Sequence, residues 1–175
     1  MACLNIPVGV SDFAEIRKNG YYYVDKSGLI EELLRTTATK VTLITRPRRF
    51  GKTLGMNMLA EFFDIRKDSR ALFEGLEIDE NTELCNRWMN QWPTIFFSLR
   101  RVDGLDFSGA YDMLCSVITE LCDSHRYLLD SEKISPYDRS VIKNILNFDV
   151  SESDIKNSLL SLTRAMQAYY GKQVI

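Results

Sequence analysis

The chain has 175 residues, of which 45% are hydrophobic and 26% charged, and its formal net charge is −2. These values fit one ordinary globular domain and exclude a disordered, fibrous or strongly basic nucleic-acid-binding protein. No apolar run reaches the ~18 residues of a membrane-spanning helix, and no signal peptide is apparent, so we predict a cytoplasmic protein with no membrane contact. Its four cysteines have no metal-ligand spacing and are predicted to be reduced.

The first third of the chain is predicted to alternate strands and helices. Asn19-Gly20 is typical of a turn, followed by a short strand at Tyr21–Val24 and a helix at about Ser27–Arg35. The β-favouring run Val41–Thr45 then predicts a buried strand.

A helix is predicted to begin near Lys52 and to turn one broad apolar face inward. Gly55 lies on that face, where it would let a neighbouring strand approach closely. Residues 64–91 are predicted to be irregular, with short helices in 69–78 and 82–91. The apolar face is formed by Leu54, Met58, Leu59, Phe62 and Phe63.

The second half is predicted to contain one strand and three helices. Apolar residues recur at helical spacing in the first and the last of these helices, and Ser151 with Asp154 forms a capping pair for the last. Gly171 suits the left-handed residue that ends this helix, and Lys172–Ile175 resembles the start of a strand, which indicates an N-terminal piece of a longer protein. The elements are a strand at Pro93–Leu99 and helices at about 108–129, 134–146 and 151–170.

This order of elements predicts an α/β fold: an incomplete three-layer P-loop NTPase domain of the ASCE or AAA-like kind with helical insertions. We predict that residues 1–175 form the N-terminal part of one such domain. Residues 1–38 would be an N-terminal strand–helix segment and residues 39–175 the P-loop core, interrupted at the start of the Walker B strand.

The stretch "VTLITRPRRFGKTLGMNML" carries the main functional signal. In a P-loop, G-x-x-x-x-G-K-[ST] joins a buried strand to a helix, and backbone N–H groups surround the phosphates. Gly51, Lys52 and Thr53 fill the last three places, whereas Arg46 stands where the first glycine is expected. Gly-Lys-Ser/Thr alone occurs by chance in about one chain in ten, so the interpretation depends on its context between a strand and a helix.

The alternative is a solvated, charged surface turn. Such a turn would not need the glycine at position 51, and crowding four cations within seven positions is more readily explained when an anion binds there. The pattern therefore favours a phosphate-binding loop over residues 46–54, namely Arg46, Pro47, Arg48, Arg49, Phe50, Gly51, Lys52, Thr53 and Leu54.

Three stretches resemble landmarks of the bacterial AAA-ATPase-like family, whose members often carry a C-terminal restriction-nuclease-like domain. These are "IPVGVSDFAEIRKNGYYYVDKSGLIEELL", "LITRPRRFGKTL" and "YYGKQVI". The family's own P-loop replaces the first glycine with Arg-Pro-Arg-Arg, so the resemblance accounts for Arg46. It also implies that the acidic Walker B motif follows "GKQVI", beyond Ile175.

The residues of the loop are assigned roles on this basis. We predict that Lys52 contacts the outer phosphates of ATP as the residue required for catalysis and that Thr53 ligates Mg²⁺. Main-chain N–H groups from Arg49 to Leu54 should line the phosphate site, and one of Arg46, Arg48 and Arg49 should add a bidentate contact. Because consecutive acids after a strand are absent from the sequence, turnover by this chain is expected to be poor even though the intact parent would be an ATPase.

Other candidate residues have simpler explanations. For Asp25 and Lys26 a place near the nucleotide and a capped, ion-paired helix start both remain open. Tyr21–Tyr23 could stack on adenine but are better explained by a half-buried strand. His125, the one histidine, is interpreted as a hydrogen-bonded core residue, and Phe62, Phe63, Phe96 and Phe97 as core.

Three functions compete on the sequence. The leading hypothesis is nucleoside triphosphate binding, and the second is a degenerate module that binds nucleic acid or a protein partner through Arg46, Arg48 and Arg49 without hydrolysis. A small-molecule kinase is disfavoured because no acceptor-activating carboxylate follows a strand. If Val41–Thr45 lacks its neighbouring strands, its exposed edge should promote self-association.

Overall fold

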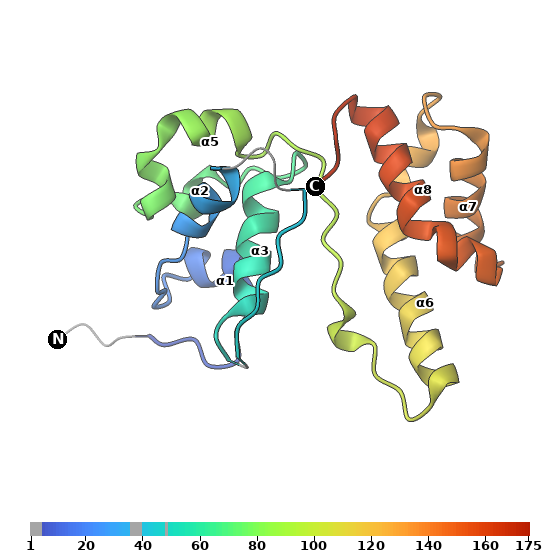
Figure 1. Ribbon diagram of the computed structural model, residues 1–175, viewed down its shortest axis with the longest axis horizontal. Helices are drawn as coiled ribbons and strands as arrows, with labels where there is room; N and C mark the ends of the chain where they lie inside the picture. Colours follow the sequence, from blue (N-terminus) through green and yellow to red (C-terminus); the bar gives the residue numbers. More distant parts are fainter. Residues whose placement is uncertain (1–4, 36–39, 48) are drawn as a thin grey trace. The chain divides into compact units, whose positions relative to one another are not determined.

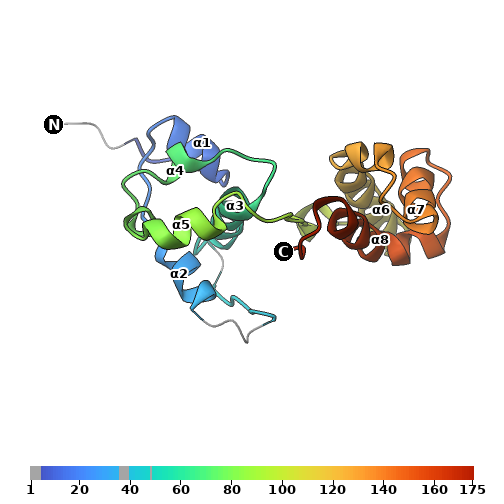
Figure 2. The same ribbon diagram turned by 90° about the horizontal axis from the view of Figure 1, so that it is seen from above.

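The computed structural model describes residues 5–35, 40–47 and 49–175. It divides into two compact units, Met1–Thr94 and Ile95–Ile175. Both units are built from helices and loops, and Figures 1 and 2 show their helices from two directions. These two units do not test the predicted bounds, 1–38 and 39–175, which divide one P-loop domain and stay predictions.

The first unit contains five α-helices and one 3₁₀ helix in its described residues. Their bounds are α1 Phe13–Lys18, α2 Gly28–Leu34, α3 Lys52–Phe63, α4 Arg70–Phe73, η1 Glu77–Glu80 and α5 Thr82–Trp88. The predicted helices after Ser27 and at Lys52 are confirmed, as are the short helices within 64–91. Helix α1 was not predicted, although its start has a sequence signal: the Asp12 side chain accepts a hydrogen bond from the N–H of Glu15 at 2.9 Å.

Aromatic side chains fill the core of this unit. The rings of Phe13, Phe62 and Phe73 are fully buried, and the ring of Phe73 lies 5.0 Å from that of Phe13 and 5.3 Å from that of Phe62, between centroids. Phe13 and Phe62 belong to α1 and α3, two helices that pack on each other. The core therefore holds the helix that follows the basic loop, and burial of each such ring contributes roughly 1.5–3 kcal/mol.

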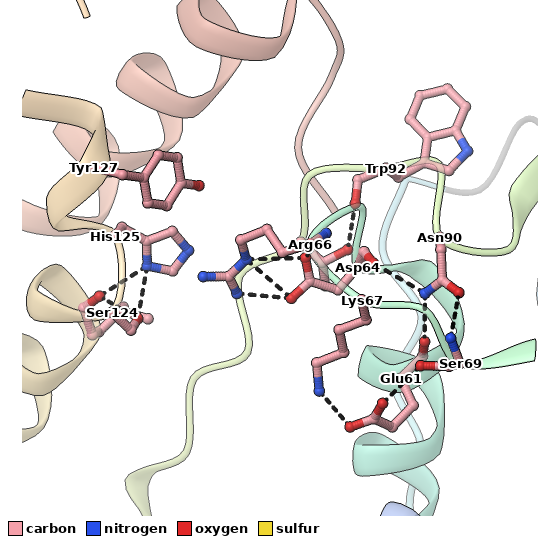
Figure 3. A network of polar contacts seen from close by, with 12 residues as sticks. Glu61, Asp64, Arg66, Lys67, Ser69, Asn90, Trp92, Ser124, His125 and Tyr127 are labelled. Carbon is pink, nitrogen blue, oxygen red and sulfur yellow. Dashed lines mark hydrogen bonds and ion pairs between the residues drawn. The ribbon is translucent and has the colours of Figure 1, made fainter. Parts of the chain in front are cut away.

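Asn90 joins the end of α3 to the loop that follows α5 (Figure 3). Its side-chain amide donates to the carbonyl oxygens of Glu61 and Asp64, both at 3.0 Å, and its side-chain oxygen accepts from the N–H of Ser69 at 2.9 Å. Its own N–H donates to the carbonyl of Phe62 at 2.7 Å. Carbonyls at the end of a helix have no partner within the helix, so Asn90 satisfies groups that α3 leaves open.

The second unit is a bundle of three longer helices, α6 Phe107–Asp123, α7 Pro136–Leu146 and α8 Glu152–Tyr170, with 3₁₀ helices η2 Leu99–Arg101 and η3 Arg126–Asp130. Helices α7 and α8 pack on each other most extensively, and small buried residues of α8, Ser158, Ser161 and Ala165, permit close packing. All three predicted helices are confirmed, although the first ends at Asp123 and its predicted last turn is η3. The predicted capping pair of Ser151 and Asp154 is present as a reciprocal capping box, and Gly171 ends α8 at φ 67°.

The predicted α/β three-layer fold is wrong for this structure. Among the described residues there is no sheet, and strand pairing is limited to an isolated parallel bridge between Asp64 and Trp92. The segments predicted as strands, Tyr21–Val24, Val41–Thr45 and Pro93–Leu99, contain no strand, although Leu99 begins η2. Preference for β structure is realised only when a neighbouring backbone supplies hydrogen bonds and packing, and these segments lack a ladder partner in the described chain.

The segment Val41–Thr45 shows this most clearly. Val41 and Leu43 are 85% and 84% exposed, although a core strand would bury them. Exposed apolar residues of this kind are a recognised cause of association, so self-association through Val41–Thr45 stays a prediction. In the second unit, the N–H of Ile95 donates to the carbonyl of Ile175 at 2.8 Å, so two segments predicted as strands meet through one backbone hydrogen bond.

Candidate functional site

The basic loop enters α3 through two residues with left-handed backbone. Arg49 has φ 69° and Gly51, the residue that caps the start of α3, has φ 74°. Left-handed backbone suits glycine, whereas an arginine held there costs roughly 1–3 kcal/mol. A conformation of this cost persists only where its surroundings enforce it, and such residues cluster at binding sites.

At the N-terminus of α3, three N–H groups lack a backbone acceptor within the described part of the chain. The N–H of Gly55 donates to the carbonyl of Gly51 at 2.8 Å, whereas those of Lys52, Thr53 and Leu54 have no backbone acceptor among the described residues. A helix start with open N–H groups carries a partial positive charge of about half a unit and favours an anion.

Lys52 folds back over the loop that precedes it. Its ammonium group donates to the carbonyl oxygens of Arg46 and, at 3.1 Å, of Pro47. The lysine predicted to contact phosphate is therefore held against the loop by two neutral acceptors. A phosphate oxygen would be a stronger acceptor for the same ammonium group, because charge-assisted hydrogen bonds are about twice as strong as neutral ones.

A cavity of about 410 Å³ lies beside this loop. Among the described residues, three cationic side chains line it, Lys26, Arg46 and Lys52, together with one carboxylate, Glu32. The remaining lining is mostly apolar and comes from three segments of the first unit: Leu29, Ile44, Phe50, Gly51, Gly55 and Met56. The cavity thus joins a cationic region to an apolar wall.

The structure brings together part of the predicted site. Arg46, Phe50, Gly51 and Lys52 line the cavity, whereas Pro47, Arg49, Thr53 and Leu54 are outside its lining. Thr53 is exposed on α3, and Leu54 packs against the core of the first unit. The third predicted arginine, Arg48, lies outside the described residues.

Several lining residues were not singled out in the sequence as ligand contacts. Leu29 and Glu32 lie one helical turn apart on α2, and Met56 lies one turn after Lys52 on α3. Such spacing places residues on one face of a helix, but the sequence does not show which face meets the loop. The predicted role of Gly55 in strand packing is wrong, since a Cβ built at Gly55 meets no atom within 4 Å.

The tripeptide Asp25–Lys26–Ser27 connects the loop to η1. The Asp25 carboxylate accepts from the N–H groups of Ser27 and Glu77, both at 2.7 Å, and the fully buried Ser27 hydroxyl accepts from the N–H of Ile78 at 3.1 Å. Partial burial acts to raise the pKa of Asp25, but the backbone donors of Glu77 and Ser27 outweigh it and lower that pKa below its ordinary value. The carboxylate is thus held in its charged form.

Tyr23 and the histidine take structural positions, whereas Tyr22 is 51% exposed. Tyr23 packs edge-on against Phe13, and its hydroxyl lies 3.3 Å from the sulfur of Met58, so burial raises the pKa of the Tyr23 hydroxyl. His125 is 1% exposed, and its Nδ1 lies 2.9 Å from the carbonyl oxygen of Leu121 (Figure 3). A carbonyl only accepts, so Nδ1 carries the proton, and the interpretation of His125 as a core residue is confirmed.

The phenylalanine predictions have mixed outcomes. Phe62 and Phe63 are buried in the first unit as predicted, and Phe97 packs against the core of the second. Phe96 is 38% exposed, so its prediction as a core residue is wrong. Cys85, Cys115 and Cys122 are free thiols as predicted, whereas Cys3 lies outside the described residues.

Among the described residues, no group of three or more His, Cys, Asp or Glu side chains could hold a metal ion. In the same part of the chain, no helix combines the length and the apolar character needed to cross a bilayer.

These features define a cationic cavity at the N-terminus of a helix, a class of site suited to an anion with an apolar part. The family model described as "Predicted AAA-ATPase" matches residues 7–175, and the chain belongs to this family.

A curated relative is similar over part of its length. It is described as an uncharacterized protein in the vnfD 5′ region of Azotobacter chroococcum mcd 1 and is 34% identical over 99 residues, which are 56% of this chain and 17% of that protein. The chain therefore spans less than a fifth of this relative. No solved structure matches the chain.

Proposed function

We propose that the chain binds a nucleoside triphosphate, ATP in the first instance, in the cavity between the basic loop and α2. The observation that carries the proposal is the composition of this cavity, in which Lys26, Arg46 and Lys52 face the same space as an apolar wall. A volume of about 410 Å³ lies within the range of ~300–1,000 Å³ that is common for small-molecule sites. Membership of the predicted AAA-ATPase family supports a nucleotide as the ligand.

The two regions of the cavity fit the two ends of this ligand. The phosphates would accept from the ammonium group of Lys52 and from the open N–H groups at the start of α3, while Arg46 adds a guanidinium contact. The base would pack on Phe50, which is 60% exposed, and on Met56, which is 45% exposed. Burial of such apolar surface by a ligand is favourable by roughly 25 cal/mol per Å².

We propose that Mg²⁺ accompanies the nucleotide and is held mainly by phosphate oxygens and water, with few ligands from the protein. The described residues do not form a magnesium site of their own, because no cluster of carboxylates is present and Thr53 lies outside the cavity lining. Mg²⁺ usually combines one or two protein ligands with phosphate oxygens and water. The Thr53 hydroxyl at the start of α3 is the ligand that the proposal assigns to this chain.

Thermal unfolding with and without Mg-ATP tests the proposal. At a ligand concentration of about a hundred times Kd, binding should add roughly 2.7 kcal/mol to the free energy of unfolding, or about 5–11 °C in Tm. Lys52→Ala should remove most of this shift, whereas Lys143→Ala, which changes an exposed lysine of α7, should keep it. An absent shift, or equal shifts in all three proteins, would contradict the proposal.

A second candidate is binding of nucleic acid or an acidic partner through Arg46 and Arg49. Both side chains are exposed, and no carboxylate pairs with either of them among the described residues. Such binding should weaken steeply as salt is raised, and each lost phosphate contact should lower the slope by about one. Filter binding to single- and double-stranded DNA at several salt concentrations measures this slope. The variants to compare with the unchanged chain are Arg49→Ala and Arg48→Ala.

A further inference from the structure

Lys26 reaches the basic loop from a distant part of the chain. It precedes α2, and its ammonium group donates to the carbonyl oxygen of Phe50 at 3.3 Å. A Cβ built at Gly51 would lie 3.3 Å from the same ammonium nitrogen. Lys26 therefore touches the loop at the two residues that come directly before Lys52.

The residues on either side of Lys26 fix this position. Asp25 is bound by the N–H of Glu77, and Ser27 is buried and bound by the N–H of Ile78, so both neighbours are anchored on η1. The Lys26 side chain, in contrast, is exposed and lines the cavity. Ligand binding by a lysine costs conformational entropy of both its side chain and its backbone. Because the backbone of Lys26 is already fixed by its neighbours, only the side-chain part of this cost remains.

The glycine next in the chain supports the same arrangement. A Cβ built at Gly28 would lie 2.7 Å from a carboxylate oxygen of Glu77, so the end of the Glu77 side chain lies directly against this position. The segment from Asp25 to Gly28 is thus fitted closely to η1, and Lys26 is the member of this segment that faces the loop.

We propose that Lys26 is a second phosphate-binding lysine, which acts with Lys52 on the same ligand, and that Asp25 and Ser27 are its positioning residues. This inference rests on the proposed function, because it assigns the ligand's phosphates to the cavity. When the ligand binds, the Lys26 ammonium group exchanges the neutral Phe50 carbonyl for a charged phosphate oxygen. The exchange replaces a neutral acceptor with a charged one and so favours ligands with more phosphate groups.

Isothermal titration of the whole chain with ATP, ADP and adenosine, in Mg²⁺, tests the inference. Lys26→Met removes the charge and keeps the length of the side chain, Lys26→Arg restores a cation, and Lys143→Met is the control. One charge-assisted hydrogen bond corresponds to about a tenfold change in Kd. We expect Lys26→Met to weaken ATP binding about tenfold or more, ADP binding by less and adenosine binding not at all, and Lys26→Arg to recover part of the loss.

The outcomes separate this inference from the proposed function. If the unchanged chain binds ATP and Lys52→Ala weakens it while Lys26→Met does not, the role of Lys26 is overturned and the proposed function stands. An equal loss for ATP and adenosine would also overturn it, since that result indicates a structural effect. If the unchanged chain binds no nucleotide, both proposals fail. Lys26→Gln serves as the second variant should Lys26→Met unfold at a lower temperature than the unchanged chain.

Discussion

Replacing Gly55 with alanine tests the structure of α3 at a position where the sequence predicts contact with a strand and the structure shows open space. Gly55 lies inside α3, and a Cβ built there meets no atom within 4 Å. Glycine in a helix interior is about 0.8–1.0 kcal/mol less favourable than alanine. Gly55→Ala should therefore raise the free energy of unfolding by roughly this amount and raise Tm by about 2–4 °C.

Gly75→Ala is the matched control. A Cβ at Gly75 also meets nothing within 4 Å, but the residue has φ 73°, so the backbone alone decides the outcome. A left-handed conformation costs a residue with a Cβ about 1–2 kcal/mol, and Gly75→Ala should accordingly lower Tm. The pair thus predicts opposite signs for the same chemical change.

Thermal and urea unfolding followed by circular dichroism measure both variants. A lower Tm for Gly55→Ala would refute the reasoning, because it would mean that Gly55 packs against a neighbour, as an α/β layered fold requires. Gly55 also lines the cavity, so the added methyl group should weaken ATP binding in the same protein that it stabilises.

Three further predictions concern other parts of the chain. Asn90→Ala removes side-chain hydrogen bonds to the carbonyls of Glu61 and Asp64 and places alanine at φ 54°. The free energy of unfolding in urea should therefore fall by about 2 kcal/mol. Asn90→Gly should recover part of the loss, because glycine adopts this φ without strain. The pKa of Asp25 is lowered in the folded protein, so its charged form stabilises the fold at pH values above its ordinary pKa. This stabilisation is lost as the pH falls through the pKa of the folded state. The free energy of unfolding should therefore change less between about pH 5 and pH 2 in Asp25→Asn than in the unchanged chain. Burial raises the pKa of Cys122 to about 11, so its alkylation by iodoacetamide at pH 8 should be far slower in the native protein than in urea, and equal rates would contradict its buried position.

Local sequence signals predicted the helices well. The capping pair at Ser151, the glycine at position 171 and the apolar periodicity after Lys52 all correspond to observed helix starts, ends or buried faces. These signals depend on residues within one or two turns of each other, so the sequence contains all the information that they need.

The strands could not be predicted in the same way. The run Val41–Thr45 has a strong β preference, yet Val41 and Leu43 are exposed and the segment forms no ladder within the described chain. Strand formation depends on a partner segment that can lie anywhere in the chain, and composition does not reveal whether that partner is present.

The candidate site was predicted in part for the same reason. The loop and Lys52 follow from a contiguous motif, but Leu29, Glu32 and Met56 reach the cavity through packing between α2, the loop and α3. Lys26 was predicted only as one of two alternatives. The anchoring of its neighbours on Glu77 and Ile78, about fifty residues away, could not be read from the sequence.

Backbone amide resonances of the whole chain, followed by NMR during titration with Mg-ATP, test the central claim most directly. The account predicts that the largest shifts occur at Gly51, Lys52 and Thr53, with smaller shifts at Lys26, and that Lys52→Ala reduces all of them. Shifts confined to residues 95–175, or no shifts at millimolar ATP, would contradict the assignment of the nucleotide site to the basic loop.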